Sequence, residues 1–154
     1  MLITFQMDIQ APIEKAFSYL EDPEKQMKWI QGLEGTENIT TFNPANPVGT
    51  KFKQRLRERG RVQEYEGQVI AYKKNNLLGI QLHLPAFLIE VKYQLEVLTD
   101  KSCRLFLTEK IEAKTLFSKI MNFLLRGIIK RTIKKQMILL KQSVEGATVL
   151  ESAE

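Results

Sequence analysis

Few side chains in this sequence could act as an acid, a base or a nucleophile, and the best candidates lie on alternating, strand-like segments. Glu58 and Glu109 each share the phase of apolar neighbours, so a strand that buries those neighbours turns the carboxylate inward. Tyr93 lies in the same phase as the apolar residues around it. General acid–base catalysis needs a titratable group positioned in a pocket, so these three residues are the candidates. For Glu109, a strand end that has already reached solvent is the competing interpretation.

Other kinds of chemistry find little support in the residue types. The single cysteine, Cys103, excludes an internal disulfide and has no partner arrangement for nucleophilic catalysis. The single histidine, His83, lies on the outward phase of its segment, and any site that needs two imidazoles is excluded. No residues have metal-ligand spacing, and no glycine-rich phosphate loop is present. We therefore expect no metal ion and no cofactor. The residue types are compatible with both an enzyme and a protein without catalytic activity.

The elements that must position these residues follow from the hydrophobic period. Residues 2–10 alternate apolar and polar side chains and indicate a half-buried strand. Pro12 and the break at Asp22-Pro23 predict two short helices directly after it. Residues 34–113 are typical of about six strands joined by short turns, which favours an antiparallel meander, and residues 116–144 have a helical pattern. The predicted fold class is therefore α+β, with a curved antiparallel sheet of about six or seven strands wrapped on a long C-terminal helix.

The length and composition of the chain suit one globular domain. It has 154 residues, of which 44% are hydrophobic and 27% are charged. We expect the domain to span residues 1–146 and a flexible tail to span residues 147–154. No apolar run reaches 18 residues, and the N-terminus lacks the pattern of a signal peptide. The expected location is cytoplasmic.

Three short motifs carry a resemblance to a known family. The first is I-x-A-P-I-E-K-A-F-x-Y-L-x-D-P-E, from Ile9 to Glu24, followed by Trp29; the others are VGTKF at 48–52 and LLKQSVEG at 139–146. With these motifs and this order of elements, the chain resembles the Bet v 1-like or START-like superfamily, the polyketide cyclase/dehydrase and lipid-transport group. The resemblance covers nearly the whole chain and implies a helix-grip fold with a cavity between the sheet and the long helix. It implies no single function, because the superfamily includes lipid carriers, hormone receptors and aromatase/cyclases.

The candidate ligand-binding residues are those that would line the implied cavity. They are inward positions of the strands, Trp29, and the side of the long helix that faces the sheet. They are mostly apolar with few polar groups, as ligand sites tend to be, and plain core packing is the competing interpretation for each apolar member. The candidates are Trp29, Phe52, Gln54, Leu56, Val91, Tyr93, Leu107, Glu109, Leu125, Ile129 and Ile133. The leading hypothesis is a non-enzymatic binder or carrier of a hydrophobic small molecule, lipid-like or aromatic. The alternatives are a cyclase or dehydrase acting on a polyketide-like substrate, and a protein-interaction module.

The long C-terminal helix carries the positive charge of the chain. Eight basic residues and no acidic residue lie between Lys114 and Lys141, while the rest of the chain holds 15 basic and 18 acidic residues. A uniformly basic nucleic-acid binder has a different charge distribution, and these basic residues are split between two faces of the helix. No nucleic-acid partner is therefore expected.

The apolar face of this helix changes direction along its length. At 100° per residue, the apolar residues of its first and second halves lie on opposed sides. Either the helix bends or breaks near Gly127, which we favour, or it stays straight and its first-half apolar residues face away from the sheet. An exposed apolar group flanked by lysines marks a membrane surface or a protein partner, so residues 116–130 are the region where we expect such a contact. The candidate interaction face consists of Phe117, Ile120, Leu124 and Ile128.

Overall fold

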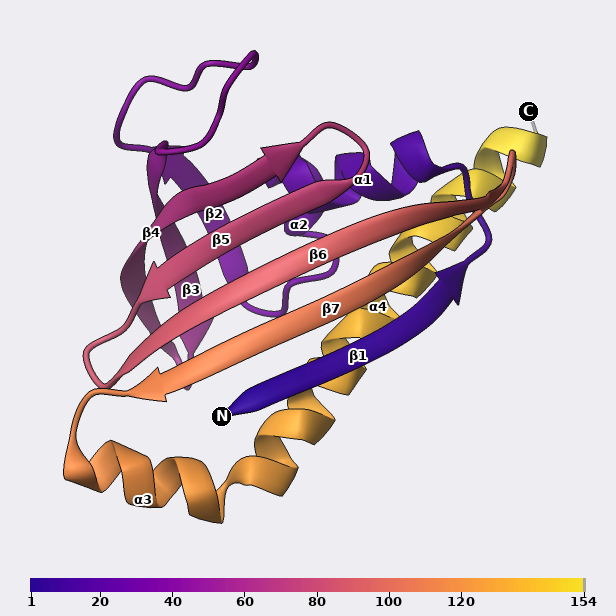
Figure 1. The fold of residues 1–154 in the computed structure, drawn as a ribbon. Helices are drawn as coiled ribbons and strands as arrows, with labels where there is room; N and C mark the ends of the chain where they lie inside the picture. The colour runs from indigo at the N-terminus through magenta and orange to yellow at the C-terminus, as the bar shows by residue number, and fades with distance from the viewer. Residues whose placement is uncertain (154) are drawn as a thin grey trace.

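Seven strands form one antiparallel sheet in this computed structural model, which describes residues 1–153 and the side chains of residues 1–146 (Figure 1). The strands are β1 (Leu2–Ile9), β2 (Leu33–Asn38), β3 (Lys51–Glu58), β4 (Arg61–Lys73), β5 (Leu77–His83), β6 (Phe87–Thr99) and β7 (Ser102–Ala113). Their order in the sheet is β1-β7-β6-β5-β4-β3-β2, so β2 to β7 pair with their neighbours along the chain and β1 pairs with β7. The antiparallel meander predicted from the alternating segments is confirmed.

Four helices accompany the sheet, two after β1 and two after β7. They are α1 (Ile13–Glu21), α2 (Pro23–Gln26), α3 (Leu116–Leu124) and α4 (Arg126–Ala153). α1 buries Phe17 and Leu20, because its apolar residues recur at helical spacing. It ends at Asp22, because Pro23 has no N–H to continue the helical hydrogen bonds. The Asp22 carboxylate then accepts a hydrogen bond of 3.0 Å from the backbone N–H of Glu24 and begins α2.

The C-terminal helical region is broken at Leu125, between α3 and α4. The bend or break predicted near Gly127 is therefore confirmed. α4 packs along β1 and α1 (Figure 1) and buries one apolar stripe, made up of Ile133, Met137, Leu140 and Val144. Among the described helices, none is long and apolar enough to cross a membrane. The flexible tail predicted for residues 147–154 lies outside the residues with described side chains and stays a prediction.

α3 buries polar residues and exposes apolar ones. Thr115 begins the helix with a capping box, and its partner Ser118 is only 2% exposed, while Asn122 one turn later is 9% exposed. More than half of the residue surface is exposed at each of the following large apolar residues: Leu116, Phe117, Ile120, Phe123 and Leu124 of α3, and Ile128 of α4. The break therefore does not bring the apolar residues of α3 onto the sheet. We expected an exposed apolar face only if the C-terminal helix were straight, but the face is exposed although the helix is broken.

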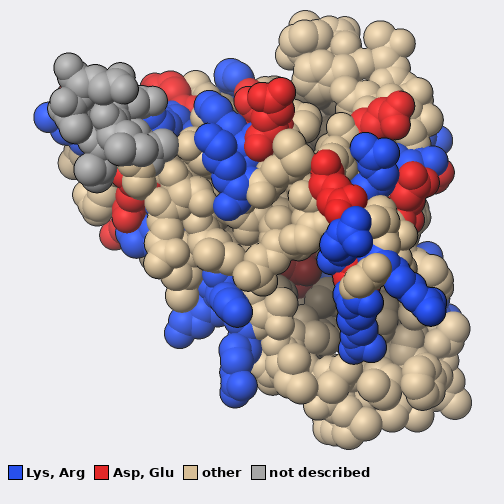
Figure 2. All heavy atoms as spheres, turned by 180° about the vertical axis from the view of Figure 1, so that it is seen from behind, with Lys and Arg blue, Asp and Glu red and all other residues tan. Residues whose placement is uncertain are grey.

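The core lies between the inner face of the sheet, α1 and α4. Leu95, Leu105 and Leu107 of the central strands are almost fully buried, and each stabilises the fold by about 1.5–3 kcal/mol. Trp29 belongs to the core and donates a hydrogen bond of 2.8 Å from Nε1 to the carbonyl oxygen of Tyr19 in α1. The molecule seen from behind is hollowed near its centre (Figure 2), so the core does not fill the whole concave side of the sheet.

Candidate functional site

A pocket of about 670 Å³ lies where the end of α1, α2, residues 39–50 and the strands β2 to β5 meet. Small-molecule sites occupy roughly 300–1,000 Å³, so this volume suits a ligand. The apolar residues that line the pocket are Pro23, Phe42, Pro44, Pro47, Phe52, Val69, Leu78 and Ile80. None of the described residues that line it belongs to α3 or α4, because α4 packs along β1 and α1 instead. The pocket therefore lies beside the C-terminal helix and not beneath it, where the resemblance placed a cavity.

Two β-bulges turn polar residues toward this pocket. The register between β4 and β5 shifts after Val69, which brings Tyr72 onto the same face as Val69. The register between β2 and β3 shifts after Leu33, which brings Thr36 onto the same face as Leu33. Strict alternation along each strand would have pointed both polar side chains outward.

A glycine fixes the position of the aromatic ring on the pocket floor. Phe52 of β3 is paired with Gly67 of β4, and its ring lies over the Gly67 backbone. A Cβ atom at position 67 would lie 2.5 Å from Cζ of Phe52 and 2.9 Å from the carbonyl oxygen of Gln81. Both distances are shorter than van der Waals contact, so the ring can occupy this position only beside glycine.

Three polar side chains of the pocket have hydrogen-bonding capacity that no described residue satisfies. Gln26 donates from Nε2 to the carbonyl oxygen of Leu20 (2.6 Å), which leaves its buried Oε1 without a donor. Oγ1 of Thr36 is also buried and unpaired. Gln54, which is paired with Thr36 across β2 and β3, is 6% exposed, and its side chain has no partner in the described part of the chain. Because a buried unsatisfied polar group costs about 1–3 kcal/mol, this corner of the pocket suits a ligand hydroxyl or carbonyl group, or water.

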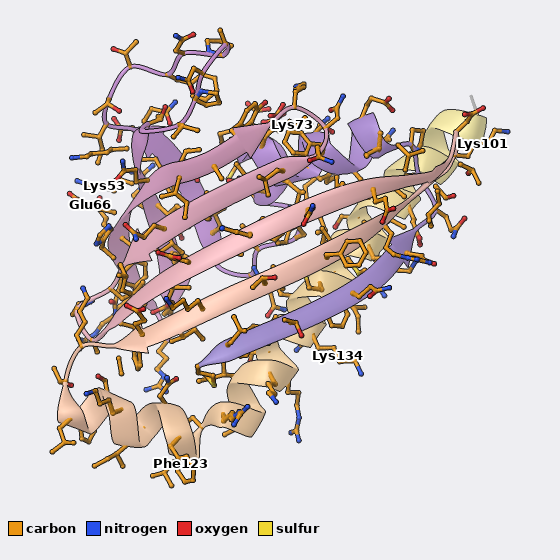
Figure 3. The ribbon with its side chains drawn as sticks, in the orientation of Figure 1. Lys53, Glu66, Lys73, Lys101, Phe123 and Lys134 are labelled. Atoms are coloured by element: carbon orange, nitrogen blue, oxygen red, sulfur yellow. The ribbon has the colours of Figure 1, made fainter. Side chains whose placement is uncertain are left out.

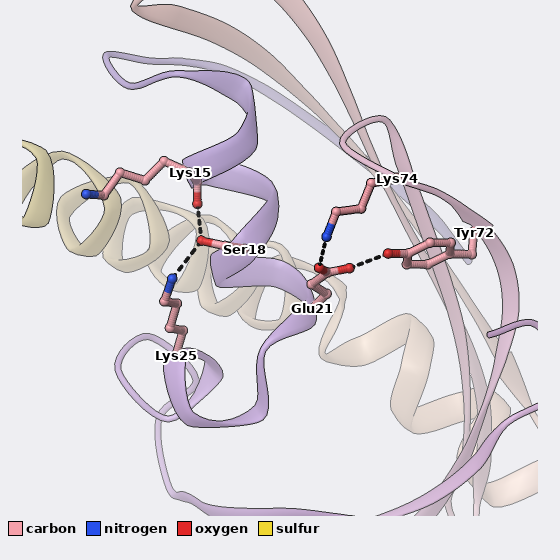
Figure 4. Close-up of polar contacts among 6 residues, drawn as sticks. All are labelled: Lys15, Ser18, Glu21, Lys25, Tyr72 and Lys74. Carbon is pink, nitrogen blue, oxygen red and sulfur yellow. Dashed lines mark hydrogen bonds and ion pairs between the residues drawn. The ribbon is translucent and has the colours of Figure 1, made fainter. Parts of the chain in front are cut away.

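Glu21, Tyr72 and Lys74 form a hydrogen-bonded group at the solvent edge of the pocket (Figure 4). The Tyr72 hydroxyl donates to Oε2 of Glu21 at 2.5 Å, and Nζ of Lys74 lies 2.6 Å from Oε1 of Glu21. Desolvation, and then the Glu21 carboxylate, raise the pKa of Tyr72, so the phenol remains a protonated donor. The charges of Glu21 and Lys74 compensate each other, while the neighbouring Asp22 carboxylate, which caps α2, also lines the pocket.

Glu109 lies on the inner face of the sheet but outside the pocket. It is paired with Ile3 of β1 and Val91 of β6, both of which are buried. Within the described residues, no hydrogen bond or ion pair reaches its carboxylate. Burial raises the pKa of Glu109 to about 7, which is the range of a general acid or base at neutral pH.

The other two acid–base candidates are poorly placed for chemistry in the pocket. Glu58 is exposed at the end of β3, where it accepts a hydrogen bond of 3.0 Å from the hydroxyl of Tyr65. Tyr93 is 8% exposed within the core, and desolvation raises its pKa, so it stays protonated. No three His, Cys, Asp or Glu side chains of the described residues are grouped to hold a metal ion.

The structure brings only part of the predicted ligand-binding set together. Phe52 and Gln54 line the pocket. Trp29, Val91, Tyr93, Leu107 and Ile133 are buried in the core, Leu56, Glu109 and Ile129 are half-buried outside the pocket, and Leu125 lies at the helix break. The role of these residues in binding stays a prediction.

Sequence reasoning missed most of the pocket wall. Tyr72 and Thr36 were missed because each residue follows a bulge in its strand, and the bulge reverses the alternation of inward and outward side chains. Phe42 and Pro47 were missed because a turn segment has no period from which an inward side can be assigned. The only available signal was the run N-P-A-N-P at 43–47, which indicates a loop stiffened by proline but gives no direction.

Known proteins share this architecture along nearly the whole chain. Residues 2–145 match the family model described as polyketide cyclase/dehydrase and lipid transport. The fold is similar to that of a START superfamily protein from Mycobacterium smegmatis, with 18% identity, a TM-score of 0.75, and coverage of 95% of this chain and 98% of that one. It is also similar to the Zhui aromatase/cyclase from Streptomyces sp. R1128, with 10% identity, a TM-score of 0.75, and coverage of 94% of this chain and 93% of that one. A protein from Thermus thermophilus has 15% identity and a TM-score of 0.72, with coverage of 96% of this chain and 99% of that one. No curated protein sequence matches the chain. The helix-grip fold that the resemblance implied is confirmed.

Proposed function

Because the chain belongs to the polyketide cyclase/dehydrase and lipid transport family, we propose that it binds or carries a hydrophobic small molecule, lipid-like or aromatic. The observation that carries this proposal is the pocket of about 670 Å³ between α2, residues 39–50 and the sheet. Phe52, Val69 and Leu78 give it an apolar floor that is fixed by the sheet. A ring or an acyl chain placed on this floor gains about 25 cal/mol for each Å² of apolar surface removed from water.

The polar corner of the pocket narrows the chemistry of the ligand. Oε1 of Gln26 can only accept a hydrogen bond, while Thr36 and Gln54 can both donate and accept. A ligand hydroxyl group supplies both a donor and an acceptor, so it satisfies Gln26 together with either of the other two. The ligand we propose is therefore an uncharged amphiphile, with an apolar ring or chain and at least one hydroxyl group.

A displacement assay tests this proposal with matched probes. The fluorescent reporter is N-phenyl-1-naphthylamine, a neutral apolar dye, and the competitors are 1-naphthol and naphthalene, which differ by one hydroxyl group. We expect the dye to bind, and 1-naphthol to displace it at a concentration at least about tenfold lower, because tenfold corresponds to about 1.4 kcal/mol, the scale of one or two buried hydrogen bonds. Failure of the dye and of both competitors to bind contradicts the proposal.

Two glutamine variants separate a pocket effect from a general one. Gln54→Leu removes a buried amide without a large change of volume, so we expect a smaller preference for 1-naphthol over naphthalene in this variant, the remainder coming from Gln26 and Thr36. Gln94→Leu makes the same change on the exposed side of β6 and should keep the preference of the parent protein. If both variants retain the preference, Gln54 does not recognise the hydroxyl group.

A cyclase or dehydrase activity on a polyketide-like substrate is the second candidate, and the observation in its favour is Glu109. A half-buried carboxyl with a pKa of about 7 and no described partner is suited to proton transfer. Ligand binding without chemistry is the stronger proposal because Glu109 does not line the pocket. Under the binding proposal, Glu109→Gln leaves the affinity for 1-naphthol unchanged.

We also propose that residues 116–130 contact a larger partner, either a membrane surface or another protein. The support is the exposed apolar face of α3, which no other described element covers.

A further inference from the structure

The exposed apolar surface of α3 is large for a protein of this size. We define the α3 face as the five exposed α3 residues Leu116, Phe117, Ile120, Phe123 and Leu124 together with Ile128 in the first turn of α4. Phe123, at 79% exposure, projects away from the body of the molecule at the end of the sheet (Figure 3). With two phenylalanines at about 200 Å² each and four aliphatic residues, the α3 face exposes on the order of 600 Å² of apolar side chain, the upper end of what monomers show.

The side of α3 that faces the rest of the protein is polar. Ser118 is hydrogen-bonded to Thr115 at both its backbone N–H and its hydroxyl, and it is buried. Asn122 continues this buried polar side one helical turn later. The side of α3 that touches β7 is therefore polar, and the apolar side faces solvent.

Basic residues lie within α3 and next to both of its ends in the sequence. Lys119 lies about 40° from Phe123 around the helix axis, at the border between the exposed and the buried side. Lys114 precedes the helix, and Arg126 and Lys130 follow it; all four basic side chains are exposed. No acidic residue occurs between positions 113 and 144. Glu112, which borders this region, is paired with Lys110 at 2.9 Å.

We propose that the α3 face docks on the surface of an anionic lipid bilayer, with its apolar residues in the boundary between headgroups and acyl chains. This inference rests on the contact proposed for residues 116–130 and is independent of the ligand pocket. A short helix with phenylalanine and leucine on one side and lysine and arginine at its borders is the pattern of an interfacial helix. Long basic side chains reach back to lipid phosphates while the apolar face is immersed.

Charge decides between a bilayer and a second copy of the chain. A symmetric dimer would bring each α3 face against itself and would place two sets of unpaired basic residues side by side. An anionic bilayer supplies apolar depth and negative charge in one surface, so it complements both features of the α3 face.

Co-sedimentation of the full chain with vesicles tests the proposal. The vesicles are phosphatidylcholine alone, or phosphatidylcholine with phosphatidylglycerol at a ratio of 7:3. In 0.1 M NaCl we expect binding to the anionic vesicles at least tenfold stronger than binding to the neutral ones, and most of this preference should be lost in 0.5 M NaCl. Equal binding to both vesicle types, or no binding to either, overturns the proposal.

Two serine substitutions at exposed sites identify the surface. Phe123→Ser should weaken vesicle binding by at least about tenfold, because it removes a phenylalanine that is buried only in the bound state. Val97→Ser also replaces an exposed apolar side chain by serine, though a smaller one, at a residue of β6 that is 57% exposed, and should bind like the parent chain. Light scattering coupled to size exclusion tests the competing interpretation, in which the α3 face binds a second copy of the chain. If the parent protein is a dimer, Phe123→Ser is a monomer and neither binds vesicles, the bilayer proposal is overturned.

Discussion

Replacing Glu109 by glutamine should remove a pH dependence from the stability of the protein. The carboxyl of Glu109 has a pKa of 4.5 in an unfolded chain, and burial raises it to about 7 in the fold. The folded state therefore holds this proton more tightly than the unfolded state does. At about 1.36 kcal/mol for each unit between the two values, the stabilisation lost on going from pH 4.5 to pH 8 is about 3 kcal/mol.

The sign of the effect follows from which state binds the proton more tightly. Below pH 4.5 the carboxyl is protonated in both states, so the parent protein and Glu109→Gln should have similar free energies of unfolding. As the pH rises from 4.5 to 7, the unfolded chain ionises more readily than the partly buried Glu109 carboxyl, which has no described partner, so the stability of the parent protein falls and then levels off. At pH 8 the glutamine variant should be more stable than the parent by up to about 3 kcal/mol.

Urea unfolding at pH 4.5, 6, 7 and 8 measures this difference, and subtraction of the two proteins cancels the titration of all other groups. Glu112→Gln is the matched control, because Glu112 belongs to the same strand but is exposed and paired with Lys110. The control should follow the parent protein at every pH. A constant difference between Glu109→Gln and the parent from pH 4.5 to pH 8 would refute the partly buried, unpaired state of Glu109.

Three further predictions follow from single contacts. Gly67→Ala should push the Phe52 ring into the pocket and lower dye affinity at least about tenfold, with a loss of about 1–3 kcal/mol in unfolding free energy; unchanged affinity would contradict the placement of the ring. Thr115→Ala removes the cap of α3 and should cost about 1 kcal/mol locally, seen as faster amide exchange in α3 with β6 unchanged; equal protection in α3 would contradict the capping role. Trp29, the only tryptophan and 2% exposed, should resist acrylamide quenching in the native protein and lose this protection in urea; ready quenching of the native protein would contradict its burial.

Regular segments could be predicted from the sequence because their periodicity is unbroken. The alternation along β6 and β7 places Tyr93, Leu95 and Leu107 inward without reference to any other element, and they are buried. The spacing of Ile133, Met137 and Leu140 likewise assigns the buried stripe of α4. In both cases a single period along the chain determines which side meets the core.

The pocket could not be predicted in the same way because its walls depend on pairing between segments. The bulges after Leu33 and Val69 are visible only once the partner strand is known. The Glu21–Tyr72 hydrogen bond joins residues 51 positions apart, and neither residue carries a local signal for the other. A hydrophobic period also shows that a helix has an apolar side, as in α3, but not whether that side meets the sheet or solvent.

The crystal structure of the complex with 1-naphthol is the measurement that tests the central claim most directly. We expect the naphthalene ring over Phe52 and Val69, with its hydroxyl group within about 3.2 Å of the Gln26, Thr36 or Gln54 side chain. Naphthol bound instead between α4 and β1, or a pocket that remains filled by water at saturating naphthol, would contradict the assignment of this pocket as the binding site.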